Sequence, residues 1–177
     1  KQNFKSDSQW LKTLELKITI ENAKSENLPR THQLLNKTNQ MNLTTRRLSE
    51  KELNSWKNKS SNKLWTIRAK DKFGDYGIIG IVSISIKNKS AKFEDFILSC
   101  RVVGRGIEKV MIEFVKDYCQ NAKIDKIKGK YLKTKKNALL FEYFKKLDLI
   151  DKNKHSFEII PNHKKFDLSN INKIKKI

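Results

Sequence analysis

The sequence predicts a single mixed α/β domain in which a mostly antiparallel sheet is flanked by helices. Three observations predict this class: strand-like alternation over Leu14–Glu21, three strands with short turns over residues 64–102, and helical periodicity over Gly106–Cys119. The 177 residues suffice for one domain. A chain of this length buries on the order of 70% of its unfolded surface.

The first half of the chain reads as a strand, two helices and a meander. Apolar side chains alternate with polar ones over Leu14–Glu21, as in a half-buried strand. Pro29 suits the first turn of a helix, and Ser49 followed by Glu52 has the spacing of a capping box. Short turns then join three strands, as in an antiparallel meander: Leu64–Ala69, a run that ends at Ile86, and Ala91–Val102.

The second half alternates helices and strands. An apolar stripe over Gly106–Cys119 predicts a helix. A strand at Ile127–Leu132 precedes a second helix, whose apolar face carries Leu139, Leu140, Tyr143, Phe144 and Leu147. Two short strands are expected at Phe157–Ile160 and Lys165–Leu168. We expect residues 1–13 to be a linker from a missing upstream domain, 14–168 to form the domain, and 169–177 to be a frayed basic tail.

Composition narrows the classes of function. The net charge of +20 comes mainly from lysines spread over every segment, which fits either solvated faces or a polyanionic partner. We favour solvated faces over a nucleic-acid partner. Two cysteines cannot form a disulfide framework, so we expect a cytoplasmic protein. Apolar runs are too short to span a membrane, and the three histidines lack metal-ligand spacing, so neither a membrane partner nor a metal is expected.

A glycine-bearing motif lies between the last meander strand and the best helix. It reads Arg101, Val102, Val103, Gly104, Arg105, Gly106. First-turn amides have no partner within a helix, and the helix dipole favours negative charge there. The motif therefore predicts either a diphosphate site, assisted by Arg101 or Arg105, or a turn needed only for tight packing.

This motif and the order of elements resemble the acyl-CoA N-acyltransferase (GNAT) fold. The family loop reads Gln or Arg, two residues, Gly, any residue, then Gly or Ala. The resemblance implies that coenzyme A or phosphopantetheine binds here, with the pantetheine arm between the fourth and fifth strands. The implied ligand-binding residues are Leu98, Ser99, Arg101, Val102, Gly104, Arg105 and Gly106.

The second half of the family pattern also appears, with two departures, one of which is Asp148 in place of the usual Gly. Asn137 and the stretch Phe144–Leu149 match the family frame. The Tyr that protonates the departing thiolate in the family is Phe144 here, and Tyr143 stands about 100° away around the helix. Asn137 and Tyr143 are the implied catalytic candidates, with core packing as the alternative for Tyr143. Because Phe144 has no proton to give, we expect poor acetylation of amines.

A narrower resemblance joins three stretches: Gln33–Leu48, Lys72–Asp75 and Leu98–Gly106. They are similar to the C-terminal part of FkbH-like proteins, which join a haloacid-dehalogenase-type (HAD) domain to a GNAT-like domain. Such proteins are implicated in loading a glyceryl unit, derived from a phosphorylated glycerate, onto the phosphopantetheine of an acyl carrier protein. The Asp-x-Asp hallmark of the HAD domain is missing, so we expect that domain upstream of residue 1.

Two further groups are candidates for substrate binding and catalysis. A polar cluster could line an acceptor pocket or only cap backbones and form turns. Its members are Thr38, Asn39, Gln40, Asn42, Thr44, Thr45 and Arg46. Cys100 precedes Arg101, whose charge would favour a nucleophilic thiolate able to carry an acyl group. Alternatively, Cys100 packs in the core, since it is in phase with Phe96 and Leu98.

Together these features predict an acyltransferase-type domain that binds a phosphopantetheine thiol and assists acyl transfer to an acyl carrier protein. A folded carrier is usually acidic, so the net charge of +20 would steer their association. The alternatives are a free-standing acetyl-CoA-dependent N-acetyltransferase and a non-catalytic module that docks the carrier.

Overall fold

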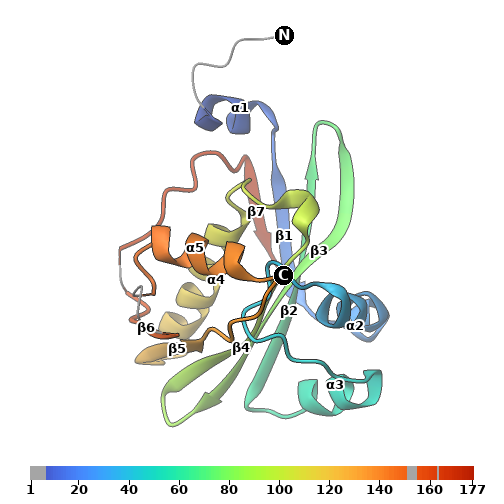
Figure 1. The fold of residues 1–177 in the computed structure, drawn as a ribbon, viewed down its shortest axis with the longest axis vertical. Coiled ribbons are helices and arrows are strands. Elements are labelled where there is room, and N and C mark those ends of the chain that lie inside the picture. Colours follow the sequence, from blue (N-terminus) through green and yellow to red (C-terminus); the bar gives the residue numbers. More distant parts are fainter. Residues whose placement is uncertain (1–6, 151–154, 163) are drawn as a thin grey trace.

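A central sheet organises the computed structural model, which describes residues 7–150, 155–162 and 164–177 (Figure 1). Two 3-10 turns interrupt the chain, at Ser25–Asn27 and Cys100–Val102. The helices are α1 (Asp7–Thr13), α2 (Leu28–Lys37), α3 (Glu50–Lys57), α4 (Ile107–Asn121) and α5 (Ala138–Lys146). The strands are β1 (Lys17–Asn22), β2 (Asn62–Asp71), β3 (Gly74–Lys87), β4 (Ser90–Leu98), β5 (Lys126–Lys130), β6 (Ser156–Ile159) and β7 (Lys173–Lys176).

The strands of the described residues lie in the order β6-β5-β4-β3-β2-β1-β7. β4 and β5 are parallel, as are β1 and β7, and the other neighbours are antiparallel. Helices α2 and α3 cover one face of the sheet and α4 and α5 the other (Figure 1). The structure therefore confirms the predicted mixed sheet between helices and the meander β2-β3-β4.

Local signals placed the first helices correctly. Pro29 lies in the first turn of α2, where its missing N–H costs nothing. The Ser49 hydroxyl accepts from the Glu52 amide, and the Glu52 carboxylate accepts from the Ser49 amide, so the capping box is present at the start of α3.

The chain ends differ from the predictions. Residues 7–13 of the expected linker form α1. Lys165–Leu168 is not a strand, and the expected frayed tail contains β7, which pairs with β1 from Lys17 opposite Lys173. The tail is held along α4, because Phe166 N donates to Glu113 Oε1 at 3.0 Å and Asn170 Nδ2 donates to Arg105 O at 2.8 Å.

Two apolar layers hold the fold together. The larger layer, under α4 and α5, centres on aromatic edge contacts of Phe144 with Phe96 and with Phe157, at ring distances of 5.2 and 5.4 Å. The smaller layer packs Leu34, Leu35 and Leu53 against the other face. Among the described helices, none has the length and apolar character that crossing a bilayer requires.

Candidate functional site

The site begins where β4 and β5 separate. The two strands pair only between Ser90–Lys92 and Lys126–Lys128. Beyond that point the segment Met41–Leu43, from the connection between α2 and α3, lies against β4. Leu43 N donates to Phe96 O at 3.2 Å, and Leu98 N donates to Met41 O at 3.0 Å. The segment extends the sheet at the place where the resemblance predicts a pantetheine arm.

Asn137 ties the other side of this segment to the connection between β5 and α5. Its Nδ2 donates to Asn42 O at 3.0 Å and to Leu132 O at 2.8 Å. Its Oδ1 accepts from the Tyr131 hydroxyl and from Thr134 N, both at 2.8 Å. Asn137 is 0% exposed, so the structure makes it a positioning residue and not a group that meets substrate.

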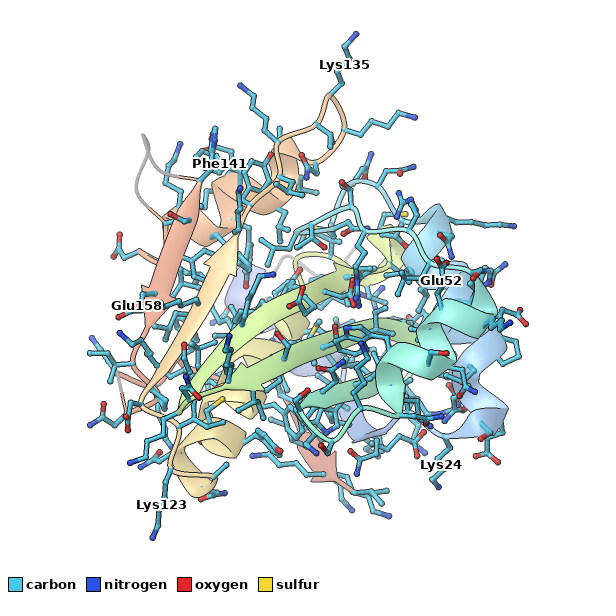
Figure 2. All side chains as sticks on the ribbon, turned by 90° about the horizontal axis from the view of Figure 1, so that it is seen from below. Lys24, Glu52, Lys123, Lys135, Phe141 and Glu158 are labelled. Carbon is cyan, nitrogen blue, oxygen red and sulfur yellow. The ribbon has the colours of Figure 1, made fainter. Side chains whose placement is uncertain are left out.

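An open cavity of about 630 Å³ lies beside this segment. It is formed by the residues that follow α2, by the end of β4 and by the loop before α5. The lining residues are Lys37, Thr38, Asn39, Gln40, Ser99, Cys100, Lys135 and Lys136. The structure thus brings part of the predicted polar cluster together with Ser99 and Cys100. Figure 2 shows Lys135 at the outer end of its loop, reaching away from the sheet.

Cys100 is exposed, so the prediction that it packs in the core is wrong. The alternation of buried and exposed residues along a strand does not apply to Cys100, because β4 ends at Leu98. Ser99 N donates to Ile79 O at 2.7 Å, and Val102 N donates to Ser99 O at 3.2 Å, which turns the chain into a 3-10 helix. The turn places the thiol in the wall of the cavity.

The rest of the polar cluster belongs to the scaffold. Asn42 is 0% exposed and its Nδ2 donates to Thr38 O, while its Oδ1 accepts from Thr45 N at 2.9 Å. The Thr44 hydroxyl donates to Glu94 O at 2.7 Å. These contacts hold the loop in place. The side chains of Asn42, Thr44 and Thr45 do not line the cavity.

Arg46 is likewise engaged inside the protein. Its guanidinium makes a two-pronged ion pair with Asp95 on β4, with Nε 3.2 Å from Oδ1. Asp95 is 0% exposed and also accepts from the Ser83 hydroxyl. The Arg46 guanidinium lies 4.5 Å from the Trp56 ring centre. The structure therefore assigns Arg46 to holding the loop on the sheet, where the sequence predicted substrate binding.

The predicted diphosphate loop is occupied by the protein itself. Gly104 and Gly106 both have φ of 81°, which turns their amides toward the start of α4. Gly104 N donates to Glu108 Oε1 at 3.0 Å. Burial raises the pKa of the Glu108 carboxyl, against the lowering effect of the amides of Gly104, Glu108 and Gly106. Glu108 is 0% exposed, and its Oε2 has no partner among the described residues.

The other predicted contacts of this loop point elsewhere. Arg105 Nη1 lies 2.6 Å from Asp71 Oδ2 and donates to the Tyr76 hydroxyl at 3.0 Å. Arg101 is exposed, and its Nε donates to Ser99 Oγ at 3.4 Å. Leu98 and Val102 are each 0% exposed and pack in the core. The residues present therefore do not fit a coenzyme A diphosphate.

Phe144 and Tyr143 on α5 both pack in or against the apolar core. Phe144, at the position of the family acid, is 1% exposed within the aromatic core. Tyr143 is half-buried and packs against the same core. Burial, and then the Glu108 carboxylate, raise the pKa of the Tyr143 hydroxyl far above its usual range. Neither side chain lines the cavity.

The sequence analysis missed four residues of this region. Lys37, Lys135 and Lys136 give the cavity its positive charge, and Glu108 fills the amide cradle. The lysines carried no distinct signal in so lysine-rich a chain. No group of three or more His, Cys, Asp or Glu residues that could hold a metal occurs in the described part of the chain.

Comparison with solved structures identifies the fold. The chain resembles the spermidine N-acetyltransferase of Vibrio cholerae in complex with CoA and spermine, with a TM-score of 0.60 and 16% identity over 82% of this chain and 96% of that one. The ribosomal-protein-S18-alanine N-acetyltransferase of Escherichia coli gives 0.57 and 10%, over 80% and 90% of the two chains. A domain from Methanocaldococcus jannaschii gives 0.60 and 16%, over 82% and 99%.

The class of fold is therefore the GNAT fold, as the sequence predicted. No protein-family model and no curated protein matches the sequence.

Proposed function

We propose that this chain is an acyltransferase-type domain that assists the transfer of a small, hydroxylated acyl group to the phosphopantetheine thiol of an acyl carrier protein. The observation that carries the proposal is the cavity, which combines the exposed Cys100 with Thr38, Asn39 and Gln40. Hydroxyl and amide groups can pair with the hydroxyls of a glyceryl-like group, and a thiol can hold its acyl carbon.

The charge of the cavity supports an anionic partner. Lys37, Lys135 and Lys136 contribute positive charge, and the lining has no carboxylate. Such a wall attracts the phosphate of phosphopantetheine and the acidic surface of a carrier. It repels a polyamine of the kind bound in the Vibrio cholerae structure. The proposal therefore places the carrier at this face of the domain.

The chemistry can proceed through Cys100 in two balanced steps. The thiolate of Cys100 attacks the carbonyl carbon of an acyl thioester donor, the new C–S bond forms, and the donor thiolate leaves and takes a proton from water. The carrier thiolate then attacks the Cys100 thioester and releases Cys100. A thiolate with a pKa of about 8.5 leaves without an acid. Phe144 is therefore compatible with thiol transfer, whereas amine acetylation would need an acid at that position.

A mass measurement tests this proposal. The protein is incubated with an acyl thioester of a short hydroxy acid, and then with a holo acyl carrier protein. We expect one acyl adduct at Cys100, which moves to the carrier, and its loss in Cys100→Ser. Cys119 is the matched control, because it is buried and burial raises its pKa to about 12.

The alternative outcomes separate the other candidates. Carrier binding without any adduct would favour the non-catalytic docking module. Rapid acetylation of amines from acetyl-CoA would instead favour the N-acetyltransferase and contradict the proposal. An upstream HAD-type domain, which the narrower resemblance implies, would be the source of the acyl group.

A further inference from the structure

Two places that an acyl-CoA would fill by the resemblance are already filled by the chain itself. Along β4, the amide of Leu98 is bonded to Met41 O at 3.0 Å. At the start of α4, the Gly104 amide is bonded to the Glu108 carboxylate at 3.0 Å. The first contact occupies a β4 amide that the resemblance would offer to the pantetheine arm, and the second occupies a loop amide that it would offer to the diphosphate.

We propose that Glu108 is a specificity-determining residue whose carboxylate occupies the amide cradle and excludes the diphosphate of coenzyme A. The domain then accepts a pantetheine thiol only from a carrier that brings no diphosphate. The identity of this thiol ligand rests on the proposed function. The exclusion itself rests on the geometry of α4 and its preceding loop.

The cradle is built for an anion, and Glu108 is that anion. Gly104 and Gly106 are left-handed, and the amides of Gly104, Gly106 and Glu108 all act on the Glu108 carboxyl, where the helix dipole adds to the attraction. The carboxylate at this point is 0% exposed, and its Oε2 has no partner among the described residues. A diphosphate would compete for the same donors and would meet a negative charge at close range.

The surrounding charges do not offset a second anion. Arg105 is bound to Asp71 and Tyr76, on the side of the β2–β3 turn. Tyr143 lies close enough to Glu108 for the carboxylate to raise its pKa. Lys109 is the cation whose charge acts on Glu108. A diphosphate could enter only if Glu108 swung away and gave up its hydrogen bond to the Gly104 amide.

Access to the loop is not what excludes coenzyme A. A Cβ placed on Gly104 would meet nothing within 4 Å, so the outer side of the loop is open. The exclusion lies in the occupied amides and the buried charge. Removing the Glu108 side chain should therefore admit the diphosphate without remodelling the loop.

Calorimetric titration with coenzyme A and with pantetheine tests the proposal on Glu108→Ala, Glu108→Gln and the wild type. We expect Glu108→Ala to bind coenzyme A at least about tenfold more tightly than the wild type. Glu108→Gln, which keeps the shape and removes the charge, should gain in the same direction. Affinity for pantetheine, which carries no phosphate, should stay within about twofold across all three. The Gly104 amide resonance should shift on addition of coenzyme A only in the variants.

Glu113→Gln is the matched control. Glu113 lies on the same helix, is 5% exposed and also has an oxygen without a partner among the described residues. Its Oε1 accepts from Lys116 and from Phe166 N, away from the cradle. We expect Glu113→Gln to leave coenzyme A affinity unchanged.

Two results would overturn the assignment of Glu108. One is wild-type binding of coenzyme A as tight as that of Glu108→Ala, with the Gly104 resonance shifting in both. The other is no gain in either variant. If Glu108→Ala does not fold, Glu108→Gln decides the question. Absence of acyl transfer to the carrier would contradict the proposed function. The coenzyme A titration would still decide whether Glu108 excludes the diphosphate.

Discussion

Asn137 offers the sharpest test of how the site is held together. Its side chain makes four hydrogen bonds, to Asn42, Leu132, Tyr131 and Thr134, at 2.8–3.0 Å. Each such bond contributes about 1 kcal/mol net, and a buried partner left unpaired costs about 1–3 kcal/mol. Because Tyr131 and Asn42 are buried, we expect Asn137→Ala to lower the free energy of unfolding by about 3–5 kcal/mol.

Urea unfolding followed by tryptophan fluorescence gives this free energy. Amide hydrogen exchange adds a local readout, since the amides of Leu43, Leu98 and Leu132 should exchange faster once the segment is released. Asn170→Ala is the control: it removes the 2.8 Å bond to Arg105 O and should cost only about 0.5–1.5 kcal/mol. A loss below about 1 kcal/mol in Asn137→Ala, with unchanged exchange, would refute the positioning role.

Four further predictions concern Arg46, Glu108, Phe144 and the net charge. Arg46→Met leaves the buried Asp95 carboxylate without its cationic partner, so urea unfolding should show a loss of about 3–5 kcal/mol, against about 0–0.5 kcal/mol for the exposed Arg101→Met. Burial raises the pKa of Glu108, so the folded protein holds this proton more tightly than the unfolded chain does. The wild type should therefore lose stability relative to Glu108→Gln as pH rises from 4.5 through the raised pKa, and a flat difference across this range would contradict it. Phe144→Tyr buries a hydroxyl in the aromatic core, so thermal unfolding should show a loss of about 1–3 kcal/mol, and amine acetylation should not appear. Raising salt from about 50 to 500 mM should slow association with an acidic carrier far more than dissociation, as measured by stopped flow.

Elements whose signals lie within one short stretch of the chain could be predicted from the sequence. The capping box at Ser49 and the apolar stripe of α4 are complete within one helix each. β7 could not be predicted, because its residues Lys173–Lys176 carry no apolar alternation and pair with β1 at the far end of the chain. Strands of this kind are specified by their partner and not by their own sequence.

Part of the lining of the candidate cavity could be predicted from the sequence, and its assembly could not. Thr38, Asn39 and Gln40 stood out as a polar cluster, and Cys100 as a thiol beside a glycine motif. That the two stretches meet at one cavity depends on the bridge between Asn42 and Ile97, which no local pattern shows. The position of Cys100 depends on the end of β4, where the chain leaves the strand period. Glu108 was missed because a glutamate in the first turn of a helix is common, and only the folded loop shows that its carboxylate closes back on Gly104.

Several arginines of this chain make fixed internal contacts, whereas the cations that line the cavity are lysines. Arg46 and Arg105 are bound to carboxylates that are 0% exposed, and Arg47 donates to Leu35 O and Asn39. The guanidinium fork suits such fixed geometry, and these side chains hold loops against the sheet. The cations that line the cavity are lysines, which are flexible and strongly hydrated. Under the proposed function, these lysines would attract an acidic carrier over distance, and the polar residues beside Cys100 would make the close contacts.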